Sequence, residues 1–126
     1  MRIALKFSAA LALAAATAGV AYATERSTEA FYAEATALKA QGIKALFSGR
    51  IGALRSEGQA AGAAAKAARE AAVRHGQKPA YCPPPNATMA DGEMLTLLAR
   101  IPKAERERLP LSQGMTRALA AKWPCQ

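Results

Sequence analysis

Alanine supplies 34 of the 65 hydrophobic residues in this chain of 126 residues, and this imbalance limits the folds that are open to it. The chain is too short for more than one ordinary domain. Only 31 hydrophobic residues are larger than alanine, which excludes the large core of a typical enzyme domain. Alanine is the best helix former, and no segment alternates between apolar and polar residues as a strand would. The sequence therefore predicts an all-α fold, a small domain of four to five helices.

The first 23 residues have the pattern of a secretory signal peptide. Arg2 and Lys6 give a positively charged start, and residues 7–23 carry no charge. Ala21-Tyr22-Ala23 offers the small residues that signal peptidase requires, so we expect cleavage after Ala23 and an exported protein. The alternative is an uncleaved membrane anchor, although this uncharged run is shorter than the roughly 20 residues of a spanning helix.

The chain has two cysteines, Cys82 and Cys125, and both follow the expected cleavage site. Exported proteins meet an oxidising compartment, so a structural disulfide between the two is the default expectation. Its closed loop would stabilise the fold by about 4 kcal/mol. Two separate thiols or a redox-active pair are the alternatives, but the sequence has no Cys-x-x-Cys spacing.

Residues 24–126 are expected to form a single helical domain after cleavage. Its Ala-rich helical half is 24–80, and its disulfide-closed half is 81–126. Loss of the two basic residues of the signal peptide lowers the net charge from +8 to +6. We expect no nucleic-acid partner, because the basic residues are not interleaved with aromatic ones, and no membrane span in the mature chain.

Two helices are predicted in the first half. Ser27 can cap a helix that begins at Thr28 and stops at Gly42. A second helix is predicted over 43–74, with a break near Ser48-Gly49. Its apolar stripe, expected to face the core, consists of Phe47, Ile51, Leu54, Gly58, Ala61, Ala65, Ala68 and Ala72.

The second half opens on three prolines, 83–85, that are expected to hold the chain extended. Asn86-Ala87-Thr88 matches a glycosylation sequon, but we interpret it as a turn Asn and a helix-capping Thr. Thr88 would then begin a helix over 89–100. The inward residues of this helix and its end are Met94, Leu95, Leu98 and Ile101.

A charged turn or short helix is expected over 103–109, between Pro102 and Pro110. Pro110 and Ser112 then open the last helix, which Pro124 ends. Its stripe repeats every four residues and consists of Leu111, Met115, Leu119 and Trp123.

No catalytic constellation is visible in the sequence. His75 is the one histidine, and no nucleophile or orienting group is placed beside it. The glycines lack the Lys-Ser/Thr of a phosphate-binding loop, and no Cys/His cluster has metal-ligand spacing. We therefore expect a protein that is not an enzyme and that carries no cofactor and no metal.

A local basic cluster is the one candidate contact surface that the sequence offers. Its members are Arg100, Lys103, Arg106 and Arg108, interrupted by two glutamates. The cluster is either a solvated turn or part of a surface for an acidic partner.

The disulfide-closed half resembles the Rap/Tai immunity proteins, which are associated with type VI secretion. The resemblance rests on Tyr81-Cys82-Pro83-Pro84, a Thr-started Leu-rich helix that ends at Pro102, and the closing Ala118-Leu119-x-x-x-Trp123-Pro124-Cys125. It implies a small, exported, helical protein with a disulfide. It further implies a protein partner in the periplasm, a peptidoglycan amidase effector that is bound and inhibited. The first half, 24–80, departs from the family pattern because it lacks further cysteines.

A second hypothesis is a periplasmic chaperone or cell-envelope accessory protein. Small size, a positive charge and one expected disulfide suggest it. The oligomeric state stays open at this stage, a homodimer included.

Overall fold

The computed structural model describes residues 25–90 and 92–126 and confirms the all-α prediction for them. The expected signal peptide and its cleavage site after Ala23 lie outside the described residues. The described parts form five α-helices and one 3-10 helix, with no strand among them. The elements are α1 (Thr28–Gln41), η2 (Gly42–Phe47), α2 (Arg50–Arg74), α3 (Glu93–Ala99), α4 (Lys103–Arg108) and α5 (Leu111–Lys122).

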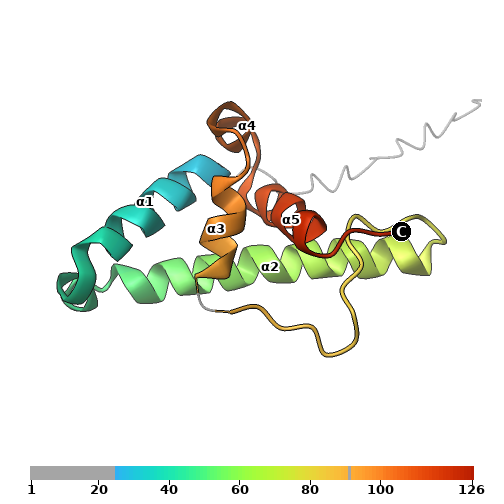
Figure 1. Ribbon diagram of the computed structural model, residues 1–126, viewed down its shortest axis with the longest axis horizontal. Coiled ribbons are helices and arrows are strands. Elements are labelled where there is room, and N and C mark those ends of the chain that lie inside the picture. The colour runs from blue at the N-terminus through green and yellow to red at the C-terminus, as the bar shows by residue number, and fades with distance from the viewer. Residues whose placement is uncertain (1–24, 91) are drawn as a thin grey trace, which may run out of the picture.

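Helices α1 and α2 form a hairpin whose two arms are joined by η2 (Figure 1). Helix α5 packs against α1, α2 and α3, and α4 packs against α1. The core lies between the arms of the hairpin and beneath α3 and α5. Its most buried large side chains are Leu98 and Leu111.

The predicted bounds of the first helix are confirmed. Ser27 Oγ accepts a hydrogen bond from the Ala30 N–H at 3.1 Å and caps the helix, as expected for a serine at this position. Phe31 and Leu38 are buried. Gly42 ends the helix with a φ of 59°, a conformation that favours glycine.

The second helix starts later than predicted. Residues 42–47 form the 3-10 helix η2, and α2 begins only at Arg50, after Gly49 with a φ of 71°. The predicted break at Ser48-Gly49 is therefore confirmed, but the helix expected before it is not. Because the chain turns there, the prediction that Phe47 faces the core is wrong.

The Ala-rich stripe of α2 is buried in its middle and exposed toward its end. Leu54, Ala61 and Ala65 are buried, whereas Ala68 is exposed, contrary to expectation. Ala65 packs with Tyr81 and Leu119 in a small separate cluster. The Arg69 guanidinium lies over the Tyr81 ring, 5.3 Å from its centroid.

The predicted disulfide between Cys82 and Cys125 is present. It lies beside the backbone hydrogen bond from Cys82 N–H to the Trp123 carbonyl, 2.8 Å long. The segment that follows Cys82 runs without regular secondary structure beneath α2 (Figure 1). The extended chain and the end of α5 are therefore held together both covalently and by a backbone contact.

The third helix is shorter than predicted because Thr88 does not cap it. Gly92, with a φ of 78°, occupies the cap position, and α3 begins at Glu93. Asn86 has a φ of 59°, which agrees with the predicted turn. The Glu93 carboxylate accepts a hydrogen bond from the Ala90 N–H at 3.0 Å. Helix α3 buries Leu97 as well as the predicted Leu98.

The stripe of the last helix is confirmed. Leu111, Met115 and Leu119 are buried, and Trp123 is half-buried.

The start of α5 also forms backbone hydrogen bonds with the start of α1. The Thr28 N–H donates to the Leu109 carbonyl at 2.8 Å, and the Leu111 N–H donates to the Arg26 carbonyl at 3.1 Å.

Gly114→Ala is expected to lower the free energy of unfolding by about 3 kcal/mol. Gly114 lies where α5 crosses α1, and a Cβ there would lie 2.5 Å from Thr28 Cγ2 and 2.8 Å from Thr28 Cβ. Thr28 cannot easily move, because it is fully buried and donates to the Leu109 carbonyl at 2.9 Å. Urea denaturation measures the loss.

Gly62→Ala is the matched control, because Gly62 is also helical but has open space where its Cβ would lie. It should raise stability by up to about 1 kcal/mol, the helix-propensity gain of alanine. Equal stabilities of the two variants would contradict the proposed steric clash.

Candidate functional site

An open apolar groove of about 570 Å³ runs between the arms of the helical hairpin. Helices α1, α2, α3 and α5 and the turn η2 all contribute to its walls. Its large apolar lining residues are Phe31, Leu38, Ile51, Leu54, Met94, Leu95 and Met115. We name this feature the groove.

Glycines of α2 keep the groove open. Gly58 and Gly62 both line it, and neither contributes a side chain that would fill it. A Cβ on Gly58 would lie 3.4 Å from the Phe31 ring, whereas one on Gly62 would project into open space. Gly58 and Gly62 lower the stability of the helix relative to alanine, and their lack of side chains leaves the space that forms the groove.

The charged residues that line the groove are both basic. Lys39 and Arg55 are exposed, and neither forms an ion pair within the described part of the chain. Apolar walls with two unpaired cations suit an amphipathic ligand or partner segment whose polar groups are acidic.

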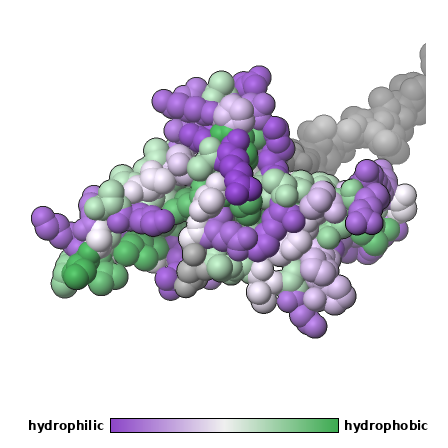
Figure 2. All heavy atoms as spheres, viewed as in Figure 1, coloured by the Kyte–Doolittle hydropathy of each residue, from purple (hydrophilic) through white to green (hydrophobic). Residues whose placement is uncertain are grey.

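A second apolar feature protrudes at the end of the hairpin. Ile43, Leu46 and Phe47 on η2 are 76%, 69% and 86% exposed. Figure 2 shows a strongly hydrophobic cluster at the end of the molecule where Figure 1 places this turn. None of the three side chains lines the groove. We call these three residues the tip.

An ion-pair network ties the two arms of the hairpin together. Glu34 on α1 binds both Arg26 and Arg50, and Arg26 Nε also reaches Glu57 Oε1 on α2 at 2.5 Å. Hydrogen bonds first from Arg26 and then from Arg50 hold the pKa of Glu34 below its ordinary value. The hydrogen bond to Glu57 is the largest cause of a raised pKa at Arg26. The network therefore fixes the walls of the groove at neutral pH.

The structure does not keep the predicted basic cluster together on the surface. Arg100, Lys103 and Arg108 are exposed, and Lys103 pairs with Glu107 at 3.9 Å. Arg106 is only 8% exposed, so its place in a contact surface was predicted wrongly.

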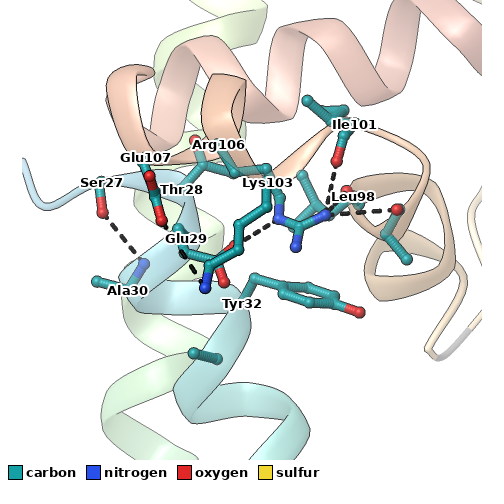
Figure 3. A network of polar contacts seen from close by, with 12 residues as sticks. Ser27, Thr28, Glu29, Ala30, Tyr32, Leu98, Ile101, Lys103, Arg106 and Glu107 are labelled. Carbon is teal, nitrogen blue, oxygen red and sulfur yellow. Dashed lines mark hydrogen bonds and ion pairs between the residues drawn. The ribbon is translucent and has the colours of Figure 1, made fainter.

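Arg106 instead joins α4 to α1 and to the end of α3 (Figure 3). Its Nε donates to Glu29 Oε2 at 2.5 Å, and its Nη1 donates to the Ile101 carbonyl at 2.6 Å. The guanidinium lies 4.3 Å from the centroid of the Tyr32 ring. A buried arginine of this kind is a structural residue, and periodicity alone could not distinguish it from its exposed neighbours.

His75 is an exposed residue at the C-terminal end of α2. Among residues 25–90 and 92–126, no group of three His, Cys, Asp or Glu side chains is arranged to hold a metal ion.

The groove and the tip were not predicted from the sequence. The signal that could have found the tip was a pair of glycines, Gly42 and Gly49, around a short apolar run.

No helix in the described residues is both long and apolar enough to cross a membrane. No family model matches the chain, and neither a curated protein nor a solved structure matches it.

Proposed function

We propose that the protein is an exported, non-enzymatic binding protein whose groove holds an apolar segment of a protein partner. The observation that carries the proposal is the groove itself, about 570 Å³ of open space between apolar walls. An apolar groove that receives the apolar face of a partner segment is a recurring mode of peptide recognition. Because the hairpin is held by ion pairs, the groove is formed before the partner arrives.

The resemblance to the Rap/Tai immunity proteins suggests the partner to be tested first, a peptidoglycan amidase effector. Met115 of α5 lines the groove, and the Cys82–Cys125 bond fixes the end of the same helix. The residues that carry the resemblance thus support one wall of the groove. Binding would inhibit the amidase by covering its active-site cleft.

Gly62→Leu tests this proposal, because Gly62 lines the groove and a Cβ there meets no atom within 4 Å, so the leucine side chain has room to occupy the groove. Gly52→Leu is the matched control on the same helix, since Gly52 is also unobstructed but does not line the groove. Amidases encoded beside the gene are co-purified with each variant and assayed for inhibition. We expect Gly62→Leu to weaken binding about 10-fold or more, with Gly52→Leu unchanged.

Two results would overturn the proposal. One is that the wild-type protein neither binds nor inhibits any of these amidases. The other is that Gly62→Leu binds as tightly as the wild type, which would move the contact surface away from the groove.

The second candidate function is a periplasmic chaperone activated by acid. The observation that favours it is the Glu34 network beside exposed apolar surface. The lowered pKa of Glu34 means that its ion pairs contribute stability above the ordinary glutamate pKa of about 4.3. That contribution is lost as the pH falls through the lowered value. Acid would then loosen the hairpin and expose apolar side chains that are buried between its arms, such as Phe31, Leu38 and Leu54.

Glu34→Gln imitates the protonated side chain at neutral pH. We expect this variant to bind an apolar fluorescent dye more strongly than the wild type at pH 7, with a smaller further increase on acidification. Wild-type dye binding that stays flat from pH 7 to about pH 3 would count against the chaperone function.

A further inference from the structure

The η2 turn buries a small apolar side chain and exposes its large ones, which is the reverse of the usual arrangement. Its smallest apolar side chain, Ala45, is 2% exposed, whereas Ile43, Leu46 and Phe47 project into solvent. The described residues include four exposed large hydrophobic side chains, and three of them are in this one turn. Exposed apolar area on this scale is unfavourable in water and marks a contact surface.

The turn is fixed in this orientation by its flanks. Gly42 and Gly49 adopt positive φ angles of 59° and 71° on either side of it. Ser48 Oγ donates to the Ala45 carbonyl at 2.7 Å. Ala45 packs into the main core. The outward position of the tip is therefore part of the fold.

The chain around the tip carries charge of one sign. Residues 35–56 contain four basic residues, Lys39, Lys44, Arg50 and Arg55, and no acidic one. All four are exposed; Arg50 is paired with Glu34, and the other three form no ion pair within the described residues. Lys44 is on the same turn as the tip residues and lies between Ile43 and Leu46 in the sequence. An apolar tip surrounded by cations is complementary to a surface that is anionic outside and apolar inside.

A second copy of the chain is not complementary in charge to the tip and its surrounding cations. If the tip of one copy entered the groove of another, Lys44 would approach Lys39 and Arg55 of the second copy. Contact between two tips would likewise bring the Lys44 side chains of both copies together. Like charges at such contacts are unfavourable.

We propose that the tip inserts into the surface of a membrane that contains anionic lipid. Ile43, Leu46 and Phe47 enter the boundary between headgroups and acyl chains, and Lys44 lies among the lipid phosphates. The six-residue turn is too short to cross the bilayer, so the protein lies on the membrane. Because the tip residues do not line the groove, the groove stays free to bind its partner.

Vesicle sedimentation tests the proposal with the chain from Thr24 onward, which the expected cleavage after Ala23 would leave and which contains every described helix. The probes are phosphatidylcholine vesicles with and without phosphatidylglycerol. We expect the wild type to bind the anionic vesicles, and to bind more weakly as salt is added. Phe47→Ser should weaken this binding about 10-fold, and Lys44→Gln about 5-fold.

The chain offers a matched control for each variant. Val73 is also an exposed hydrophobic residue, but it lies at the other end of α2, so Val73→Ser should bind as the wild type does. Lys78→Gln makes the same charge change at an exposed site far along the sequence and should also bind normally. Circular dichroism confirms that each variant is folded.

Three results would overturn the proposal. They are no wild-type binding to anionic vesicles, equal binding of Phe47→Ser and wild type, and equal loss in Phe47→Ser and Val73→Ser. Dimerisation that Phe47→Ser abolishes, without vesicle binding, would assign the tip to a second copy instead. Because Gly62→Leu alters the groove alone, failure of the partner proposal leaves this test unaffected.

Discussion

Replacing Cys82 and Cys125 together with alanine is expected to lower the free energy of unfolding by about 4 kcal/mol. The bond joins residues 43 positions apart, and the loop between them contains α3, α4 and α5. Without the bond, the unfolded chain regains the conformational freedom of that loop. For a small domain with a total stability of about 5–15 kcal/mol, the loss is a large share. Equilibrium urea denaturation at neutral pH measures it.

The wild-type protein unfolded in the presence of dithiothreitol is the control for this variant. Reduction opens the same loop without changing any other side chain, so both samples should lose similar stability. A loss below about 1 kcal/mol in the double variant would contradict the expectation that loop closure dominates.

Arg106→Ala should cost about 3–5 kcal/mol, which is the usual effect of removing one partner of a buried ion pair. The Glu29 carboxylate would be left without its partner, and the Ile101 carbonyl would lose a hydrogen-bond donor. The Tyr32 ring would also lose the guanidinium that lies against it. Thermal and urea denaturation should both show the loss, because α4 is held to α1 by this side chain (Figure 3).

Arg108→Ala is the control, since Arg108 lies on the same helix and is exposed. It should change stability by no more than about 0.5 kcal/mol. Arg106→Lys should recover only part of the loss, because an ammonium group lacks the planar set of donors that the carboxylate and the carbonyl require. Equal losses of stability in Arg106→Ala and Arg108→Ala would contradict the expectation that the buried contacts of Arg106 stabilise the fold.

Much of the fold could be predicted from local signals in the sequence. Ser27 and Gly42 bound α1 through the hydrogen bonds and dihedral angles of their own residues. The four-residue spacing of Leu111, Met115 and Leu119 identified the buried face of α5. The disulfide followed from the count of cysteines and the expected compartment. Each of these predictions depends on neighbours in the sequence or on a property of the whole chain.

The groove, the tip and the buried arginine could not be predicted in this way, because each depends on contacts between distant parts of the chain. Phe47 fits the helical stripe in the sequence, but α2 begins only at Arg50, so Phe47 lies in η2 and is exposed. Arg106 is one of four nearby cations, and only the approach of Glu29, 77 positions away, makes it a core residue. Thr88 has the right spacing for a cap, but Gly92 occupies that position instead.

The central place of α5 has a consequence for the order in which the protein folds. Helix α5 follows the other four helices in the sequence, and yet it packs against α1, α2 and α3. Thr28 at the start of α1 closes its backbone hydrogen bond with Leu109, 81 positions later. The hairpin therefore cannot bury its apolar walls fully until α5 has been synthesised. Folding must wait for α5, so a chain cut short before Leu111 should remain unfolded and be degraded.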